Sequence, residues 1–438
     1  MNIAVFGLGK LGSCIAAVLA QTNNVFGVDA LEETARLIDA GQPPLNVSEP
    51  GLAELLASAH EMETLKAGRD VYRAVSQSDI AIIITPTPSQ PNGLFDSTCV
   101  ADVLNSITYC LKSQDAREKP FVVVIVSTLT PGSMMSLSSM AKMQLADAHS
   151  NGIVLLYSPV FVALGNVILN LCAPDAVLIG IGSEEERPYA DLYRNLLVDS
   201  VFTKIVPVRV MTWIEAELAK LTLNVMLSVK ALWANEIAMI AQAAEAQGAP
   251  ILDFVGLDSR IGPKMLKPGF PPGGPCLPRD VRCLHALCTL LGESRGMLAA
   301  LQRAREQQFF TIAEEVSLLG YGVKIGFVGF SYKPGTPVTE DSPSIHLAKR
   351  LLQQYGLYSL MYDIEAVLPD DLPEGIQSTD ALMDVIIECP VVVIGVSDAR
   401  YVKALAEIDL SNTVIYDVWG LLAETPHAGG FNYYRFGG

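Results

Sequence analysis

Residues 2–29 read NIAVFGLGKLGSCIAAVLAQTNNVFGVD, and this stretch carries the strongest fold signal in the chain. A β-rich run ends at Phe6, the pattern GxGxxG occupies Gly7–Gly12, and small residues typical of a helix follow from Ser13 to Ala20. Glycines at these positions allow a tight turn and a close backbone approach, which puts a pyrophosphate against the amides of the helix N-terminus. The pattern alone is weak because glycine is common, but a strand, this turn and a helix in that order favour a dinucleotide-binding Rossmann domain.

Asp29 closes the second β-rich run, Val25–Val28, about 20 residues after the turn. A carboxylate at that position accepts hydrogen bonds from the adenosine ribose hydroxyls and repels a 2′-phosphate. The sequence therefore predicts NAD rather than NADP as the cofactor. The alternative is a structural turn that binds no ligand.

The alternation of strands and helices continues outward from this region. Further β-rich runs at Ile80–Thr85 and Phe121–Ser127 predict a parallel sheet covered by helices. From about Thr212 to Ala246 apolar residues recur at helical spacing without Pro or Gly, which predicts one helix of about 50 Å. The alternation restarts at Lys324, and three more strand candidates end at Asp363, Ser397 and Asp417.

These patterns predict an α/β chain with two Rossmann-like domains joined by a central helical module. We expect an NAD-binding domain over residues 1–200, a helical module that includes a cysteine loop over 201–305, and a second Rossmann-like domain over 306–438. A dimer formed across the long helix and a purely internal helix are equally compatible with its pattern.

The composition narrows the possible partners and location. Half of the 438 residues are hydrophobic, 18% are charged and the net charge is −17, which argues for a globular protein and against nucleic acid as a partner. We expect a cytoplasmic protein, since the first residues resemble no signal peptide and no uninterrupted apolar stretch reaches about 18 residues. Eight irregularly spaced cysteines indicate reduced thiols, and the five isolated histidines predict no metal site.

Cys276 lies in an unusual setting, the segment GFPPGGPCLPRD of residues 269–280. Structural cysteines usually sit on apolar helices or strands, as the surroundings of Cys14, Cys283 and Cys288 suggest for those three. Cys276 instead occupies a loop rich in Gly and Pro, where nearby cations or helix amides can lower the pKa of a thiol. The segment favours a reactive cysteine.

Glu217, Lys220 and Asn224 on the long helix are spaced by three and four residues and share one helix face. A Lys and an Asn one turn apart can stabilise an oxyanion or hold a water molecule. Charged residues on one face more often form a solvated stripe, and spacing alone favours that interpretation.

The ordered motifs of the chain resemble the UDP-glucose and GDP-mannose dehydrogenases, essentially from end to end. In order they are Gly7–Gly12 with Asp29, Glu49–Leu52, Thr85–Pro88, Ser127-Thr128 with Pro131-Gly132, Glu215–Leu218 with Lys220 and Asn224, Asn235-Glu236, Asp258–Gly262, Gly273–Cys276 with Asp280, and Tyr332–Pro334.

The resemblance implies an oxidation of the C6 alcohol of a nucleotide diphosphate sugar, such as UDP-glucose, to a carboxylate with two NAD, in a homodimer. It implies that Cys276 adds to the intermediate aldehyde, that Lys220 and Asn224 stabilise the oxyanion, and that Asp280 positions or activates water. For NAD it implies contacts from Gly7, Gly9, Lys10, Leu11, Gly12, Asp29, Thr87 and Thr128. For the sugar nucleotide it implies contacts from Lys220, Asn224, Gly273 and Lys333, and from Arg260 toward the substrate of the partner subunit.

The sequence departs from the family at positions expected to be functional. Val160 stands where family members carry a glutamate that helps deliver the hydrolytic water, and Leu164 replaces a second acid. Glu340 replaces a cofactor-side arginine. The late Asp-Gly-Arg motif of the family reads Asp417-Val418-Trp419 here, so Trp419 replaces another cation expected near the substrate. A general base typically contributes about 10²- to 10⁴-fold to a rate, so hydrolysis of a thioester should slow without it.

Three hypotheses follow from the retained and lost residues. The first is a nucleotide-sugar 6-dehydrogenase with an altered substrate, since Cys276, Lys220, Asn224 and Asp280 are all present. The second is a two-electron oxidation of a related sugar nucleotide or phosphorylated alcohol, which the missing glutamate motivates. The third is a non-catalytic relative that binds NAD or a nucleotide, which the altered cations motivate.

Overall fold

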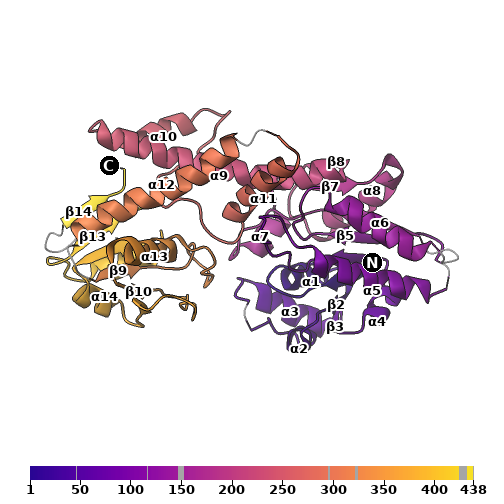
Figure 1. Ribbon diagram of the computed structural model, residues 1–438. Helices are drawn as coiled ribbons and strands as arrows, with labels where there is room; N and C mark the ends of the chain where they lie inside the picture. Colours follow the sequence, from indigo (N-terminus) through magenta and orange to yellow (C-terminus); the bar gives the residue numbers. More distant parts are fainter. Residues whose placement is uncertain are drawn as a thin grey trace. The chain divides into compact units, whose positions relative to one another are not determined.

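The computed structural model describes residues 1–45, 47–115, 117–146, 152–293, 296–320, 324–423 and 432–437. The chain divides into two compact units, Met1–Leu221 and Thr222–Gly438 (Figure 1). Each unit is built on its own sheet, flanked by helices. The predicted α/β fold with two Rossmann-like sheets and one long helix is confirmed, whereas the three domain boundaries stay a prediction.

The first unit contains an eight-stranded sheet in the order β3-β2-β1-β4-β5-β6-β7-β8. All neighbouring strands are parallel except β6 and β7. Because β1 lies between β2 and β4, the direction of strand progression reverses at β1, and the carboxyl ends there form the usual ligand crevice of such sheets. The strands are β1 Asn2–Phe6, β2 Asn24–Val28, β3 Leu65–Gly68, β4 Ile80–Ile83, β5 Phe121–Ile125, β6 Ile153–Tyr157, β7 Val177–Ile181 and β8 Val208–Thr212.

Two separate hydrophobic cores lie on the two faces of this sheet. Helices α1, α3, α7 and α8 contribute to one core, and α4, α5 and α6 to the other (Figure 1). Strands covered on both faces need apolar residues throughout, which is why β5 reads FVVVI with every residue buried. The helices are α1 Gly12–Leu19, α2 Glu32–Asp39, α3 Leu52–Glu61, α4 Val71–Gln77, α5 Thr98–Lys112, α6 Ser133–Leu145, α7 Val167–Cys172 and α8 Arg187–Ser200.

The second unit contains a six-stranded parallel sheet in the order β11-β10-β9-β12-β13-β14. Helices α12 and α13 pack on one face, and α14 and α15 on the other. The strands are β9 Ile325–Val328, β10 Ser359–Tyr362, β11 Ile376–Ser378, β12 Val391–Ile394, β13 Val414–Asp417 and β14 Asn432–Arg435. The helices are α10 Gly248–Gly256, α11 Leu277–Leu290, α12 Gly296–Leu319, α13 Pro343–Tyr355, α14 Leu382–Glu388 and α15 Ala399–Ala406.

Helix α9, Trp213–Ala243, is the long helix that the sequence predicts, and it has 31 residues. By length and mean hydropathy alone it is apolar enough to cross a membrane, although no transmembrane helix is predicted from the sequence. Long helices that pack in the core of a protein meet the same criterion. Its Glu217 and Lys220 are buried among protein groups.

Candidate active site

The glycine turn between β1 and α1 has the geometry of a dinucleotide site. Gly7 adopts φ +93°, and its N–H donates to the Val28 carbonyl oxygen at 2.8 Å. A β-carbon on Gly12 would lie 1.8 Å from the Gly7 carbonyl oxygen, so only glycine fits there. At Gly9, by contrast, a β-carbon would meet no described atom within 4 Å, and a ligand can approach the backbone at this point. The adjoining Lys10 is exposed and Leu11 is half-buried.

Asp29 is held at the carboxyl end of β2 by the backbone around it. Its Oδ2 accepts from the Leu8 N–H at 2.7 Å, and its Oδ1 accepts from the Leu31 N–H at 2.9 Å. The carboxylate is therefore fixed beside the glycine turn and is half-buried. This position fits a partner for the hydroxyls of a bound ribose, and the contact itself stays a prediction.

Thr87 and Thr128 follow β4 and β5 and are bonded to each other. The Thr87 hydroxyl donates to the Thr128 carbonyl oxygen at 2.8 Å, and the Ser127 hydroxyl donates to the Thr85 carbonyl oxygen at 2.7 Å. The two loops are thus joined at the same edge of the sheet as the glycine turn. Their predicted contact with NAD is compatible with this placement.

Glu217 on α9 binds the start of helix α6. Its two carboxylate oxygens accept from the Gly132 N–H at 2.6 Å and from the Met134 N–H at 2.8 Å. The side chain is fully buried, and burial raises the pKa of this carboxyl above its usual value. Glu217 therefore anchors α9 to the first unit rather than facing solvent.

Lys220, one turn further along α9, is buried against the segment that follows β6. Its Nζ donates to the Val160 carbonyl oxygen at 2.9 Å and lies 4.6 Å from the centroid of the Phe161 ring. Lys220 and Asn224 are each only 7% exposed. The solvated stripe that spacing alone favours is therefore wrong, because these side chains find buried partners.

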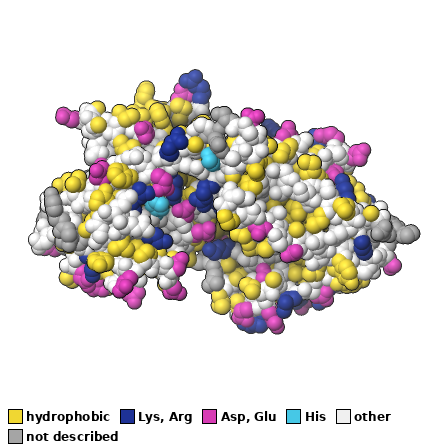
Figure 2. Space-filling model, viewed as in Figure 1, with side chains coloured by type: hydrophobic (Ala, Val, Ile, Leu, Met, Phe, Trp, Pro, Cys, Tyr) yellow, Lys and Arg dark blue, Asp and Glu magenta, His cyan; other side chains and the backbone are white. Residues whose placement is uncertain are grey.

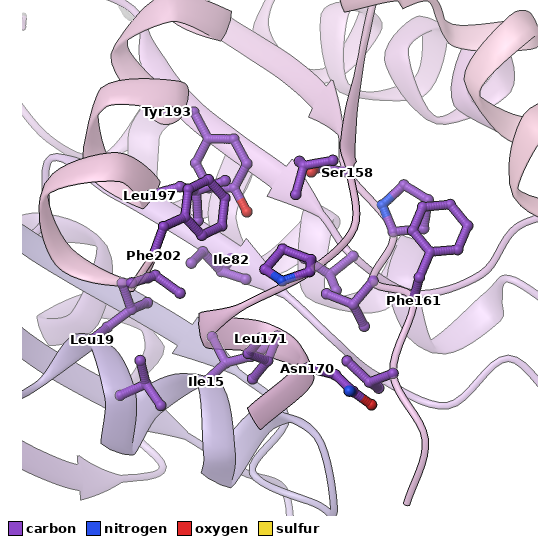
Figure 3. Close-up of a pocket in the computed structure, with 18 of the residues that line it drawn as sticks. Ile15, Leu19, Ile82, Ser158, Phe161, Asn170, Leu171, Tyr193, Leu197 and Phe202 are labelled. Carbon is purple, nitrogen blue, oxygen red and sulfur yellow. The ribbon is translucent and has the colours of Figure 1, made fainter. Parts of the chain in front are cut away.

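The segment from Ser158 to Val162 lies over an apolar cavity in the first unit (Figure 3). Figure 3 shows Phe161 beside this cavity, with Ile15 from α1 and Tyr193 from α8 around it. Burial raises the pKa of Tyr193 to about 12, as expected in surroundings with few polar groups. Val160 packs against the adjoining hydrophobic core, so an apolar side chain stands where the resemblance leads one to expect a carboxylate.

Glu49 fixes the far end of this same segment. Its carboxylate accepts from the Gly165 N–H at 2.9 Å and from the Val167 N–H at 2.6 Å, at the start of α7. The segment is thus held at Val160 by Lys220 and at Gly165 and Val167 by Glu49. The sequence motif at Glu49–Leu52 gave no indication of this anchoring role.

Asn224 and Asp280 form a buried pair in the second unit. The Asn224 Nδ2 donates to the Asp280 Oδ2 at 2.6 Å, and Asp280 is 2% exposed. The Asp280 N–H also donates to the Cys276 carbonyl oxygen at 3.0 Å. The fold therefore brings together three of the predicted residues, from α9, from the first turn of α11 and from the residue that precedes α11.

Cys276 is exposed, and all eight cysteines lie in the described part of the chain without forming a disulfide. Cys14 and Cys283 are buried and Cys288 is half-buried, as their apolar helical surroundings suggest. Burial raises the pKa of the Cys14 thiol to about 12, which disfavours the nucleophilic thiolate. Cys276 stands apart from these three in its exposure and its place at a helix start.

Gly273 and Gly274 give the cysteine loop a tight fit. A β-carbon on Gly273 would lie 2.6 Å from the Asp341 carbonyl oxygen, and one on Gly274 would lie 2.3 Å from Cδ2 of Tyr332. Gly274 also adopts φ +80°. The structure thus provides a packing reason for Gly273, and its predicted contact with substrate stays a prediction.

Arg260 and Lys333 lie on loops of the second unit. The Arg260 side chain is 87% exposed and binds the Asp258 carboxylate at 2.6 Å. Lys333 is half-buried, with its Nζ 5.8 Å from the centroid of the Tyr332 ring. Their predicted substrate contacts, including that of Arg260 across a dimer, stay predictions.

The two remaining substitutions lie in different surroundings. Glu340 is exposed. Trp419 packs closely on the start of the cysteine segment, since a β-carbon on Gly269 would lie 2.2 Å from its Cζ3 and its ring meets Phe270 edge-on at 5.9 Å. Trp419 therefore fills space beside the loop with an apolar ring instead of a cation.

Comparison with known proteins decides the family. The NAD binding domain of the UDP-glucose/GDP-mannose dehydrogenase family matches residues 1–197, and the central domain of that family matches residues 214–307. The chain belongs to this family. It is an NAD-dependent dehydrogenase, and the predicted cofactor is confirmed.

The sequence of this chain aligns with individual relatives over most of the length of each relative. GDP-mannose 6-dehydrogenase of Pseudomonas aeruginosa is 29% identical over 358 residues, 80% of this chain and 79% of its own. GDP-mannose 6-dehydrogenase of Pseudomonas savastanoi pv. phaseolicola is 27% identical over 451 residues, 98% of each chain. The structure of a UDP-glucose dehydrogenase from Pyrobaculum islandicum, 24% identical, superposes with a TM-score of 0.85 over 99% of this chain and 98% of that one.

Proposed function

We propose that this dehydrogenase oxidises the C6 alcohol of a nucleotide diphosphate sugar to a carboxylate through a covalent adduct on Cys276. The observation that carries the proposal is the arrangement around that thiol. An exposed cysteine at a helix start is followed, one turn later, by a buried Asp280 that is bonded to Asn224. The relatives named GDP-mannose 6-dehydrogenase and UDP-glucose dehydrogenase support a sugar nucleotide as the substrate class.

NAD⁺ held at the glycine turn and Asp29 would supply the hydride acceptor for both oxidations. In the first, the alcohol loses a hydride from carbon and a proton from oxygen and becomes an aldehyde. The Cys276 thiol then adds to the aldehyde carbon, and the thiol proton passes to the carbonyl oxygen. Loss of a second hydride from the carbon and of the hydroxyl proton from this hemithioacetal leaves a thioester. Water finally breaks the carbon–sulfur bond, which releases the carboxylate and restores the thiol.

The other residues of the proposed catalytic set have distinct tasks in this scheme. The ammonium of Lys220 and the amide of Asn224 stabilise negative charge on the reacting oxygen. The Asp280 carboxylate, held in one orientation by Asn224 at 2.6 Å, positions the hydrolytic water and accepts its proton. Val160 offers no carboxylate to this step, so hydrolysis is expected to be the slow part of the cycle.

The same substitution favours a second candidate, a two-electron oxidation that stops at the aldehyde. Val160 contributes an apolar side chain and its backbone carbonyl is already bonded to Lys220. A protein of this kind would release one NADH per substrate and no carboxylate. The product therefore separates the two candidates.

The test is to incubate the protein with NAD⁺ and a panel of nucleotide sugars that includes UDP-glucose and GDP-mannose. NADH absorbance reports turnover, and mass spectrometry of the product identifies alcohol, aldehyde or carboxylate. We expect NADH and a uronic acid with at least one member, and much less NADH when NADP⁺ replaces NAD⁺, because Asp29 repels the 2′-phosphate. Absence of NADH with every sugar nucleotide would overturn the proposal.

A further inference from the structure

The loop that carries Cys276 is bonded at two points to residues outside the proposed reaction chemistry. The Gly274 N–H donates to the Asp341 carbonyl oxygen at 3.0 Å. Two residues earlier, the Pro272 carbonyl oxygen accepts from Nε of Arg305 on α12 at 2.8 Å. These bonds lie on either side of Gly273 and hold the loop immediately before the cysteine.

Asp341 and Arg305 are also joined to each other. The Arg305 Nη2 lies 2.9 Å from the Asp341 Oδ1, and the two side chains are only 13% and 23% exposed. Arg282 on α11 approaches the other carboxylate oxygen at 3.7 Å. Nε2 of His346 lies 3.7 Å from a carboxylate oxygen of Glu306, the neighbour of Arg305 on α12. Basic and acidic side chains lie side by side on the face of the molecule that Figure 2 shows. The Arg305 guanidinium thus binds the Pro272 carbonyl of the loop and also Asp341, whose own carbonyl binds the loop at Gly274.

The backbone of Asp341 is constrained as well. Its φ of +49° lies in the left-handed region, which residues other than glycine seldom adopt and which Asp and Asn tolerate best. Such a conformation persists only where the surrounding structure fixes it. Here it turns the Asp341 carbonyl toward the Gly274 amide, and the ion pair with Arg305 fixes the side chain of the same residue.

The loop has no room to settle elsewhere. Gly273 packs against Asp341 and Pro343 on one side, and Gly274 packs against the Tyr332 ring on the other, both closer than a β-carbon would allow. Any displacement of Asp341 would therefore move the backbone that carries Cys276. A displacement of about 1 Å at reacting groups can cost on the order of 10²-fold in rate.

We propose that Asp341 and Arg305 are positioning residues that hold the Cys276 loop in its reactive geometry. The proposal rests on the proposed function, in which Cys276 is the reacting thiol. It assigns a role to two side chains that take no part in the bond-making steps. It also predicts that the two residues act as one unit, because Arg305 bonds to Asp341 and to the loop simultaneously.

Three variants and one control test the positioning role. Asp341→Asn removes the charge but still tolerates the left-handed backbone. Arg305→Lys keeps the charge but cannot make the forked contacts of a guanidinium. The third is the double variant, and the control is Glu388→Gln, which removes another ion pair of the second unit, the 2.6 Å contact with Lys324.

The first measurement is hydrogen exchange of the peptide that contains residues 269–280, which does not depend on activity. We expect faster exchange in this peptide for both single variants, unchanged exchange in the glycine turn of the first unit, and no change in either region for Glu388→Gln. Wild-type exchange in both single variants would overturn the proposal, even if their activities fell.

The second measurement is kcat and the KM for NAD⁺ with the nucleotide sugar that the panel identifies. We expect kcat to fall on the order of 10²-fold with the KM for NAD⁺ unchanged, and the double variant to be no slower than the slower single variant. If kcat of the two single variants equalled that of the Glu388→Gln control, a positioning role would be contradicted. If the fold-losses in kcat multiplied in the double variant, the two residues would not share that role. If Cys276→Ser still released as many NADH per nucleotide sugar as the wild type, the proposed function would be overturned instead. The hydrogen-exchange data would then show separately whether Asp341 and Arg305 hold the loop.

Discussion

At the scale of single residues, Val160 is the substitution with the clearest chemical consequence. Its side chain packs on the core of the first unit, and its backbone carbonyl oxygen accepts from Lys220 at 2.9 Å. The contact with Lys220 therefore does not depend on which side chain stands at position 160. What the substitution removes is a carboxylate.

Restoring an acid at this position should accelerate hydrolysis. We expect Val160→Glu to form the carboxylate product faster by up to about 10²-fold, because a second carboxylate would help Asp280 to deliver the hydrolytic water. The measurement is the rate at which a covalent adduct on Cys276 disappears, followed by intact-protein mass spectrometry after rapid quenching.

Val160→Gln is the matched control, since it has the same size as Val160→Glu but cannot take a proton at neutral pH. It should behave as the wild type does. Equal rates in the Glu and Gln variants would show that water is not activated from position 160.

At the scale of elements, two glycines in the turn between β1 and α1 are needed for different reasons. A β-carbon on Gly12 would collide with the Gly7 carbonyl at 1.8 Å, whereas one on Gly9 would meet no described atom within 4 Å. Gly12 is therefore required by the fold of the turn itself. Gly9 is not required by protein packing, which leaves the close approach of a ligand as its reason.

The two alanine variants should therefore behave differently. Gly9→Ala should unfold at the same denaturant concentration as the wild type and yet bind NAD more weakly, because its methyl group occupies the space above the turn. Gly12→Ala should lower both stability and NAD affinity, since the turn must distort. Denaturant unfolding and calorimetric titration with NAD measure these effects, and wild-type affinity in Gly9→Ala would place the dinucleotide elsewhere.

At the scale of the whole molecule, most of the fold was predictable from local sequence patterns. The glycine turn, the apolar strands and the 31-residue α9 each follow from short-range spacing, and each was predictable. Strands such as β11, Ile376–Ser378, and β14, Asn432–Arg435, were not predicted, because runs this short become strands only through pairing with neighbours distant in sequence.

The candidate site likewise contains residues that local sequence predicts and residues that only long-range contacts place. Cys276 and Asp280 were predictable from the loop and from the family motif, but the burial of Glu217 was not, because its partners Gly132 and Met134 are more than 80 residues away. Asp341 was missed for a related reason. Its left-handed backbone and its ion pair with Arg305 arise only when α12 and the segment before α13 come together.

The measurement that tests the central claim most directly is the number of NADH molecules released per nucleotide sugar, in the wild type and in Cys276→Ser. We predict two NADH and one carboxylate for the wild type. We predict at most one NADH, with aldehyde as the product, for the serine variant, because its hydroxyl is a far weaker nucleophile than a thiolate. Cys99→Ser, at another exposed cysteine outside the proposed site, should match the wild type. Two NADH per sugar at the wild-type rate in Cys276→Ser, or one NADH and no carboxylate in the wild type, would contradict the account.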